Sequence, residues 1–226
     1  MKTILVVGGS KGIGNAIINQ LKDTYKIINF SRSEVDSHPN ITHYSVDITK
    51  DELPDLNEDI HGLVYCPGSI NLKPVNRLSL DDFRNDFEIN VIGAVKVIQK
   101  YINQLKNNDA SVVLFSTVAT KLGMPFHASV AASKSAVEGL TKSLAGEFAT
   151  KARFNCIAPT VTDTSLAEKL LRNEKLKENM ENRHPLKKYL KADEVASLAS
   201  YLLSDASTAI SGQVFPIDAG IVSLKL

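Results

Sequence analysis

The sequence predicts an α/β protein in which helices cover both faces of a doubly wound, mainly parallel sheet. Short apolar runs rich in β-branched residues alternate with longer segments whose apolar residues recur at helical spacing. Such alternation is typical of βαβ units, whose strands lie parallel. The chain has 226 residues, 43% of them hydrophobic, and no repeat or linker. We therefore expect one domain over residues 1–226, built as three layers of helix, sheet and helix.

The periodicity predicts seven strands and five helices. Strands are expected over residues 4–7, 27–30, 41–46, 62–66, 112–115, 154–158 and 213–217. Helices are expected over residues 13–21, 83–105, 131–150, 165–182 and 192–204. Only residues 32–40, with Pro39 among them, separate the second and third strands, which is too few for a helical crossover. This crossover should therefore be shortened to a loop or a single turn.

Composition and charge argue against several classes of partner. The 26 Lys and Arg residues nearly balance the 25 Asp and Glu residues, so bulk charge favours neither nucleic acid nor a polycation. No apolar run approaches the roughly 20 residues that cross a bilayer, and the N-terminus lacks a signal-peptide pattern. Cys66 and Cys156 lie far apart and in no metal-ligand spacing. We expect a cytoplasmic protein without a membrane segment or a metal site.

A glycine-rich turn follows the first strand and opens the first helix. It reads Gly8-Gly9-Ser10-Lys11-Gly12-Ile13-Gly14. Glycines allow a tight turn and a close approach of the backbone to a pyrophosphate, and the helix N-terminus offers N–H groups to the anion. In a βαβ series this position favours a dinucleotide site over an ordinary strand-to-helix turn.

The end of the second strand bears on the choice of cofactor. A carboxylate there would bind the adenine ribose hydroxyls and repel a 2′-phosphate, but the strand ends at Ser31 and Arg32 without an acid. Arg32 is placed to bind a 2′-phosphate, with Lys11 on its other side. The alternative is that both cations are merely solvated. We predict NADP(H) in preference to NAD(H).

The spacing Gly-x-x-x-Gly-x-Gly resembles that of the short-chain dehydrogenase/reductase family. Further segments match the family in order: Asp47-Ile48, Asn90-Val91-Ile92-Gly93, Ser133-Lys134, Asn155 to Pro159 with Thr164, and Asp218-Ala219-Gly220. The resemblance covers essentially the whole chain and implies a Rossmann-type fold and a small-molecule carbonyl or alcohol substrate. Together with the turn, it implies these cofactor-binding residues: Gly8, Ser10, Lys11, Gly12, Ile13, Gly14, Ser31, Arg32, Asp47, Ile48, Cys66, Pro67, Gly68, Asn90, Lys134, Pro159, Thr160 and Thr164.

The catalytic pattern departs from the family at its proton donor. The family places a Tyr four residues before the active-site Lys, and here that position is Val130. Thr117, thirteen residues before Val130, matches the carbonyl-binding Ser of the family, with Ser116 as the alternative. There are two further departures. The segment that resembles the family's Asn-Asn-Ala-Gly reads Tyr65-Cys66-Pro67-Gly68, and Thr160 stands in place of the Gly after the family's Pro.

Two residues are candidates for the missing donor. His127, three residues before Val130, has the side chain best matched to proton transfer near neutral pH, although a histidine in a loop is more often a surface residue. Lys134 could protonate the substrate through a water, or could serve only to bind the cofactor. Cys66 is better explained as a packed small residue than as a nucleophile. The candidate catalytic residues are therefore Asn90, Thr117, Lys134 and His127.

Two functions remain open at this point. The first is an NADP(H)-dependent carbonyl reductase with an altered proton donor. The second is a catalytically impaired dinucleotide-binding protein that acts as a sensor or partner subunit, because function lies in the site rather than in the fold. Residues 164–191, where the family builds its substrate lid, carry eight Lys and Arg against four Glu, which suits an anionic substrate or simply a solvated helix. The family's subunit-packing helices match residues 83–105 and 131–150, which implies a homo-oligomer, most simply a tetramer.

Overall fold

The computed structural model describes residues 1–225 and contains a seven-stranded parallel sheet in the order β3-β2-β1-β4-β5-β6-β9. The predicted doubly wound α/β fold is confirmed. Each strand lies within two residues of its expected bounds. The strands are β1 (Thr3–Val7), β2 (Lys26–Ser31), β3 (Ile41–Ser45), β4 (Gly62–Tyr65), β5 (Ala110–Phe115), β6 (Ala152–Pro159) and β9 (Val214–Ile217).

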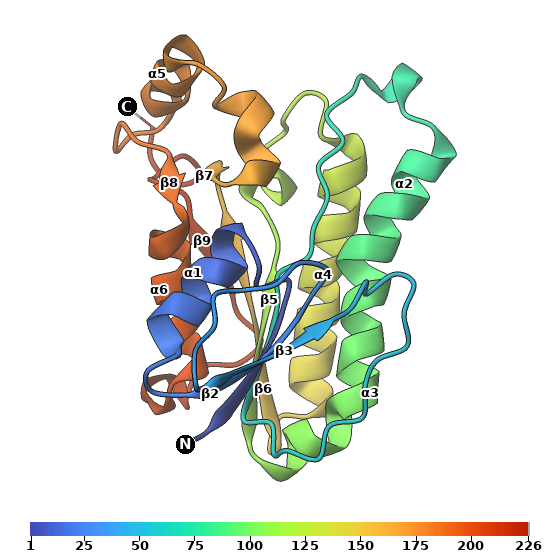
Figure 1. Cartoon of the computed structure of the whole chain (residues 1–226). Coiled ribbons are helices and arrows are strands. Elements are labelled where there is room, and N and C mark those ends of the chain that lie inside the picture. Colours follow the sequence, from blue (N-terminus) through green and yellow to red (C-terminus); the bar gives the residue numbers. More distant parts are fainter. Residues whose placement is uncertain (226) are drawn as a thin grey trace.

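Helices cover both faces of this sheet, as Figure 1 shows. One face carries α1 (Gly12–Leu21) and α6 (Ala192–Leu203), and the other carries α3 (Gly93–Asn107) and α4 (Ala128–Glu147), beside which lies α2 (Leu80–Phe87). The two cores take alternate residues of each strand: Leu5 packs toward α3 and α4, whereas Ile4 packs toward α1 and α6. No helix among the described residues is long and apolar enough to span a membrane.

The shortened crossover between β2 and β3 is also confirmed, since residues 32–40 form no helix. The next crossover, from β3 to β4, likewise lacks one. In its place Leu53, Leu56 and Ile60 are buried against the sheet, and the Tyr101 hydroxyl of α3 donates to the Pro54 carbonyl at 2.6 Å. Side chains of an extended segment thus cover the area that a helix would otherwise cover.

Two of the predicted helices were wrong in extent. A capping box between Ser79 and Asp82 starts α2 at Leu80, and a π-helical turn over Glu88–Ile92 then separates α2 from α3. The expected helix over 165–182 is instead a 3₁₀ segment, Ser165–Leu170, followed by α5 (Glu174–Arg183). The side chain of Asn173 accepts from the Leu176 N–H and begins α5 there. Helix α4 begins and ends three residues earlier than expected, and a two-stranded sheet of β7 (Thr162–Asp163) and β8 (Leu190–Lys191) was not predicted.

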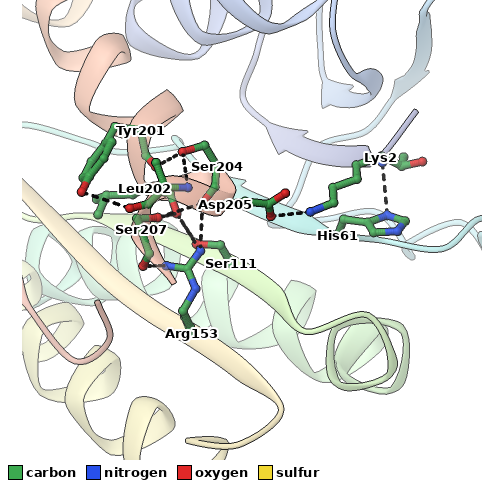
Figure 2. A network of polar contacts seen from close by, with 11 residues as sticks. Lys2, His61, Ser111, Arg153, Tyr201, Leu202, Ser204, Asp205 and Ser207 are labelled. Atoms are coloured by element: carbon green, nitrogen blue, oxygen red, sulfur yellow. Dashed lines mark hydrogen bonds and ion pairs between the residues drawn. The ribbon is translucent and has the colours of Figure 1, made fainter. Parts of the chain in front are cut away.

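Arg153, at the start of β6, links the sheet to the C-terminal end of α6 (Figure 2). Pro159 lies at the opposite end of the same strand. Its guanidinium donates to the carbonyls of Ser207 at 2.7 Å, Leu202 at 3.1 Å and Ile210 at 3.2 Å. The Ser111 hydroxyl also donates to the Leu202 carbonyl, at 2.6 Å. These bonds satisfy carbonyls at and beyond the C-terminus of α6 that have no partner within the helix.

Replacing Arg153 should therefore destabilise the fold without altering the residues at the carboxyl ends of the strands. We expect Arg153→Leu to lower the free energy of unfolding by about 2–3 kcal/mol, because a hydrogen bond to a charged group contributes roughly 1.5–3 kcal/mol, although each carbonyl keeps a second donor. Urea denaturation measures this change. Arg84→Leu is the control, since Arg84 is exposed and pairs only with Asp81 one helical turn away. Equal denaturation midpoints for the two variants would contradict this account.

Candidate active site

Two joined cavities open at the carboxyl ends of the strands. The first, called the groove, has a volume of about 390 Å³ and runs along the glycine turn and the end of β2. The second, called the inner pocket, has a volume of about 210 Å³ and lies between β5, the start of α4 and the segment after β6. Five residues line both cavities and mark where they join: Ile13, Cys66, Gly68, Thr164 and Leu166.

The glycine turn leaves room that side chains would fill. Gly8 and Gly12 adopt positive φ values of 82° and 54°, which L side chains rarely adopt. A Cβ on Gly14 would lie 2.3 Å from the Gly8 carbonyl oxygen, so only glycine allows α1 to approach the turn this closely. Lys11 precedes α1 without capping it by a side-chain hydrogen bond. The helix N-terminus at the groove is thus suited to an anion.

Asn29 of β2 is hydrogen-bonded to this turn, a role that sequence reasoning missed; its one signal was a polar residue in an apolar strand. Its side-chain oxygen accepts from the Gly9 N–H at 3.0 Å, and its amide nitrogen donates to the Ser31 hydroxyl at 2.8 Å. Ser31 in turn donates to the Ser33 carbonyl. The Ser31 hydroxyl, predicted to contact cofactor, is therefore occupied by structural hydrogen bonds on both sides.

Two exposed cations, Lys11 and Arg32, line the groove. Asp47 is the sole carboxylate among the described residues of its lining. Thr49 donates to that carboxylate from its hydroxyl at 2.7 Å and from its backbone at 3.1 Å. These bonds, more than the nearby Arg32, lower the pKa of Asp47. The open turn, the uncapped helix and the two cations fit a phosphate-bearing dinucleotide.

Lys134 lies buried at the junction of the two cavities. Its ammonium donates to the Phe115 carbonyl at 2.9 Å, at the end of β5. Burial lowers the pKa of Lys134 to about 8. A Cβ on Gly68 would lie 3.5 Å from this ammonium and 3.3 Å from the side-chain oxygen of Asn90. Gly68 therefore leaves open the space beside both polar groups.

Asn90 sits in the π-helical turn, a feature often found at functional sites. Its amide nitrogen donates to the Asp86 carbonyl at 2.8 Å and to the hydroxyls of Ser69 and Ser133 at 3.2 and 3.3 Å. Its side-chain oxygen is buried and has no hydrogen-bond partner within the described chain. A buried acceptor of this kind favours a polar ligand or a water beside Gly68.

The fully buried carboxylate of Asp86 was not foreseen. It accepts from the hydroxyls of Ser69 and Ser129 and from the amide of Asn71 at 3.0 Å. Ser69 lines the inner pocket, and Ser129 directly precedes Val130. Asp86 thereby joins the loop after β4 to the first turn of α4.

Of the two hydroxyls considered for carbonyl binding, Thr117 is the free one. The Ser116 hydroxyl donates to the buried carboxylate of Glu138 at 2.6 Å, and that carboxylate also accepts from Thr120. The Thr117 hydroxyl oxygen accepts from the Ala119 N–H at 3.3 Å, which leaves its proton available. Both residues line the inner pocket, but only Thr117 can donate there without breaking a bond.

Val130 and His127 also line the inner pocket. Val130 is buried, and no tyrosine lines either cavity within residues 1–225. The His127 Nδ1 lies 2.7 Å from the Pro125 carbonyl and must carry the proton of that bond, so Nε2 is the free nitrogen of a neutral ring. Burial raises the pKa of the Cys66 thiol to about 12, which argues against a nucleophile.

A second histidine, His184, lines the inner pocket and was missed in the sequence. It is buried at the end of α5, where Nδ1 donates to the Met180 carbonyl at 2.6 Å. Its Nε2 lies 2.8 Å from the Thr160 hydroxyl. Thr160, which replaces the Gly of the family pattern, thus connects the end of β6 to the lid. Thr164 packs close to Gly12, where a Cβ would lie 3.1 Å from its methyl.

Comparisons with known proteins agree with this architecture. The family model described as Enoyl-(Acyl carrier protein) reductase matches residues 34–222. The chain is 30% identical to 3-oxoacyl-acyl-carrier-protein reductase FabG of Thermotoga maritima, over 98% of both chains. It is 28% identical to L-xylulose reductase of Caenorhabditis elegans, over 97% of this chain and 95% of the other.

Solved structures also match this chain over nearly its whole length. A short chain dehydrogenase family protein of Francisella tularensis superposes with a TM-score of 0.91 at 26% identity, covering 99% of this chain and 100% of that one. Ligand-free aldohexose dehydrogenase of Thermoplasma acidophilum gives 0.91 at 27% identity, covering 99% and 95%. The glycine turn, the parallel sheet and these matches together show that the chain belongs to the short-chain dehydrogenase/reductase family of oxidoreductases.

Proposed function

We propose that the protein is an NADPH-dependent reductase of a small carbonyl compound, working with an altered proton donor. The observation that carries the proposal is the junction of the two cavities, where Gly68 lies beside the Lys134 ammonium and the Asn90 side-chain oxygen, with Thr117 in the lining of the inner pocket. The curated relatives named above are reductases, which favours catalysis over the impaired sensor or partner subunit. A cytoplasmic location remains a prediction from the cysteine content.

The residues of the groove would hold the cofactor as follows. The glycine turn and the N-terminus of α1 would bind the pyrophosphate, and Arg32 with Lys11 would bind the 2′-phosphate. Asp47 and Ile48 would contact the adenine, while Pro159, Thr160 and Thr164 would lie beside the nicotinamide. When bound, the cofactor supplies a hydride at the junction of the two cavities.

The inner pocket would handle the carbonyl oxygen and its proton. Thr117 would donate a hydrogen bond to that oxygen, which polarises the carbonyl. Lys134 is the better proton donor, because a pKa of about 8 leaves it protonated at neutral pH yet acidic enough to transfer a proton through a water beside Gly68. His127 is the second candidate; its Nε2 would donate only from the doubly protonated ring, since Nδ1 holds the proton of the neutral ring in the bond to the Pro125 carbonyl.

Arg32→Asp should reverse the cofactor preference. The change replaces attraction to the 2′-phosphate by repulsion, so the Kd for NADPH should rise by about tenfold or more while NADH binds better, since a charge-assisted hydrogen bond contributes roughly 1.5–3 kcal/mol. Fluorescence titration with each cofactor measures both constants. Lys26→Asp, at the other end of β2, is the control. An equal loss of affinity for both cofactors would show that Arg32 does not discriminate.

Val130→Tyr should restore the phenol that the family uses. General acid catalysis contributes about 10²–10⁴ in rate, so kcat for NADPH oxidation with simple ketones should rise by about 10² or more. The absorbance of NADPH measures this rate. His127→Ala in the wild-type background should retain activity if Lys134 is the donor. The thermal unfolding midpoint of the variant shows whether the larger side chain overpacks the site. If the variant folds and binds NADPH but gains no rate, the pocket does not place a carbonyl group beside position 130.

The pH profile of reduction should show the titration of Lys134. Because the protonated ammonium is the active form, kcat/KM should be level at neutral pH and fall about tenfold per unit once the pH rises past about 8. Steady-state rates at saturating NADPH test this. Lys134→Arg keeps the charge at high pH, but its guanidinium does not release a proton, so the variant should be slow at every pH and show no fall. A profile that already falls below pH 7 would contradict the assignment of Lys134 as the donor.

The protein is further proposed to be a homo-oligomer, most simply a tetramer. Leu80 and Phe87 on α2 and Ile92 in the π-helical turn are exposed, and burying such apolar side chains favours association. Light scattering at micromolar concentration should give a mass that is a multiple of 24.6 kDa. A mass equal to one chain would contradict the proposal.

A further inference from the structure

The charged side chains that line the inner pocket within the described residues are all cationic. Most of the lining is apolar, with Ile70, Val118, Val161 and Leu170 among its residues. Two cations, Lys134 and Arg183, and two imidazoles also line it, whereas no aspartate or glutamate among the described residues does. A site with cations and no carboxylate attracts anions and repels cations.

Arg183 is the cation that the reaction does not require. It lies in the last turn of α5 and is exposed at the pocket. No carboxylate in the described chain lies within ion-pair distance of its guanidinium, and its nearest polar contact is the Met180 sulfur at 4.0 Å. By contrast, Lys177 and Lys188 of the same lid are paired with Glu174 and Glu194. The Arg183 guanidinium therefore keeps its hydrogen-bond donors free for a ligand.

The backbone beside Arg183 is held in place. His184, the next residue, is anchored by the Met180 carbonyl and by the Thr160 hydroxyl of the segment that follows β6. These two bonds fix the end of α5 over the inner pocket. Guanidinium geometry also matches carboxylate and phosphate groups, which it binds through two parallel hydrogen bonds.

We propose that Arg183 is a specificity residue and that the substrate is a carbonyl compound with an apolar body ending in an anionic group, carboxylate or phosphate. The inference rests on the proposed reductase function. In the reaction the carbonyl carbon gains the hydride and its oxygen gains a proton, while the anionic group stays unchanged on Arg183.

Matched substrates test the proposal by kinetics. The wild type should reduce levulinate with a kcat/KM about tenfold or more above that for its methyl ester, the value expected for one charge-assisted hydrogen bond. Dihydroxyacetone phosphate against dihydroxyacetone tests the phosphate in the same way, and the larger ratio identifies the anion. Arg183→Gln should abolish the preference by lowering kcat/KM for the anionic compounds toward the values for the neutral ones. Lys175→Gln is the control, because Lys175 is exposed on α5 and does not line the pocket.

Three kinetic results would contradict the proposed role of Arg183. Equal rates with the acid and the ester, or an equal loss with both in Arg183→Gln, would overturn the proposal. An effect of Lys175→Gln as large as that of Arg183→Gln would also overturn it, because it would show a general field of the lid rather than a binding residue.

A binding measurement separates this inference from the proposed function. Calorimetry of the NADP⁺-loaded protein with hexanoate and hexanamide needs no turnover. Hexanoate should bind about tenfold or more tightly, and Arg183→Gln should remove the difference. If no carbonyl is reduced but hexanoate is still preferred, the proposed function fails and the anion site stands. If hexanoate and hexanamide bind equally, the anion site fails whatever the turnover.

Discussion

Burial of the Lys134 ammonium is the constraint on which the rest of the site depends. A charged group taken out of water must be compensated by hydrogen bonds and nearby charge. The Phe115 carbonyl at the end of β5 provides the hydrogen bond, and Asp86 favours the charged form. Helix α4 is thereby fixed against β5 at the point where the two cavities join. The same burial brings the pKa of Lys134 to about 8, within reach of proton transfer at physiological pH.

Buried polar groups surround this lysine on the side of the first turn of α4. With Val130 in the position of the family's tyrosine, the wall of the pocket is apolar where a phenol would lie. The carboxylate of Asp86 accepts from both Ser69 and Ser129 and so links the loop after β4 to the start of α4. Buried networks of this kind are costly when incomplete and rigid when satisfied. The polar groups beside Val130 are therefore held in a satisfied hydrogen-bond network.

A hydrogen bond between Thr160 and His184 links the end of α5 to the segment after β6. Thr160 introduces a hydroxyl where the family pattern has glycine. The Nε2 of His184 lies 2.8 Å from this hydroxyl and forms a hydrogen bond with it. Either group alone would be a buried polar atom without a partner. Their bond fixes the end of α5 above the inner pocket, which gives Arg183 a defined position at the substrate side. This hydrogen bond and the pairing of β7 with β8 join the segment after β6 to the segment around α5.

The sequence by itself determined the parallel sheet, the glycine turn and the helix that carries Lys134, because each depends on local periodicity or on backbone freedom at a few glycines. It also located Val130 and Thr117 by spacing. Only the tertiary structure decided the π-helical turn at Asn90, the Asp86 cluster and the pairing of Thr160 with His184. These features rest on hydrogen bonds between residues far apart in the chain, 43 positions for Asp86 with Ser129 and 24 for Thr160 with His184. No local pattern encodes such contacts, since they exist only after the sheet has brought the segments together.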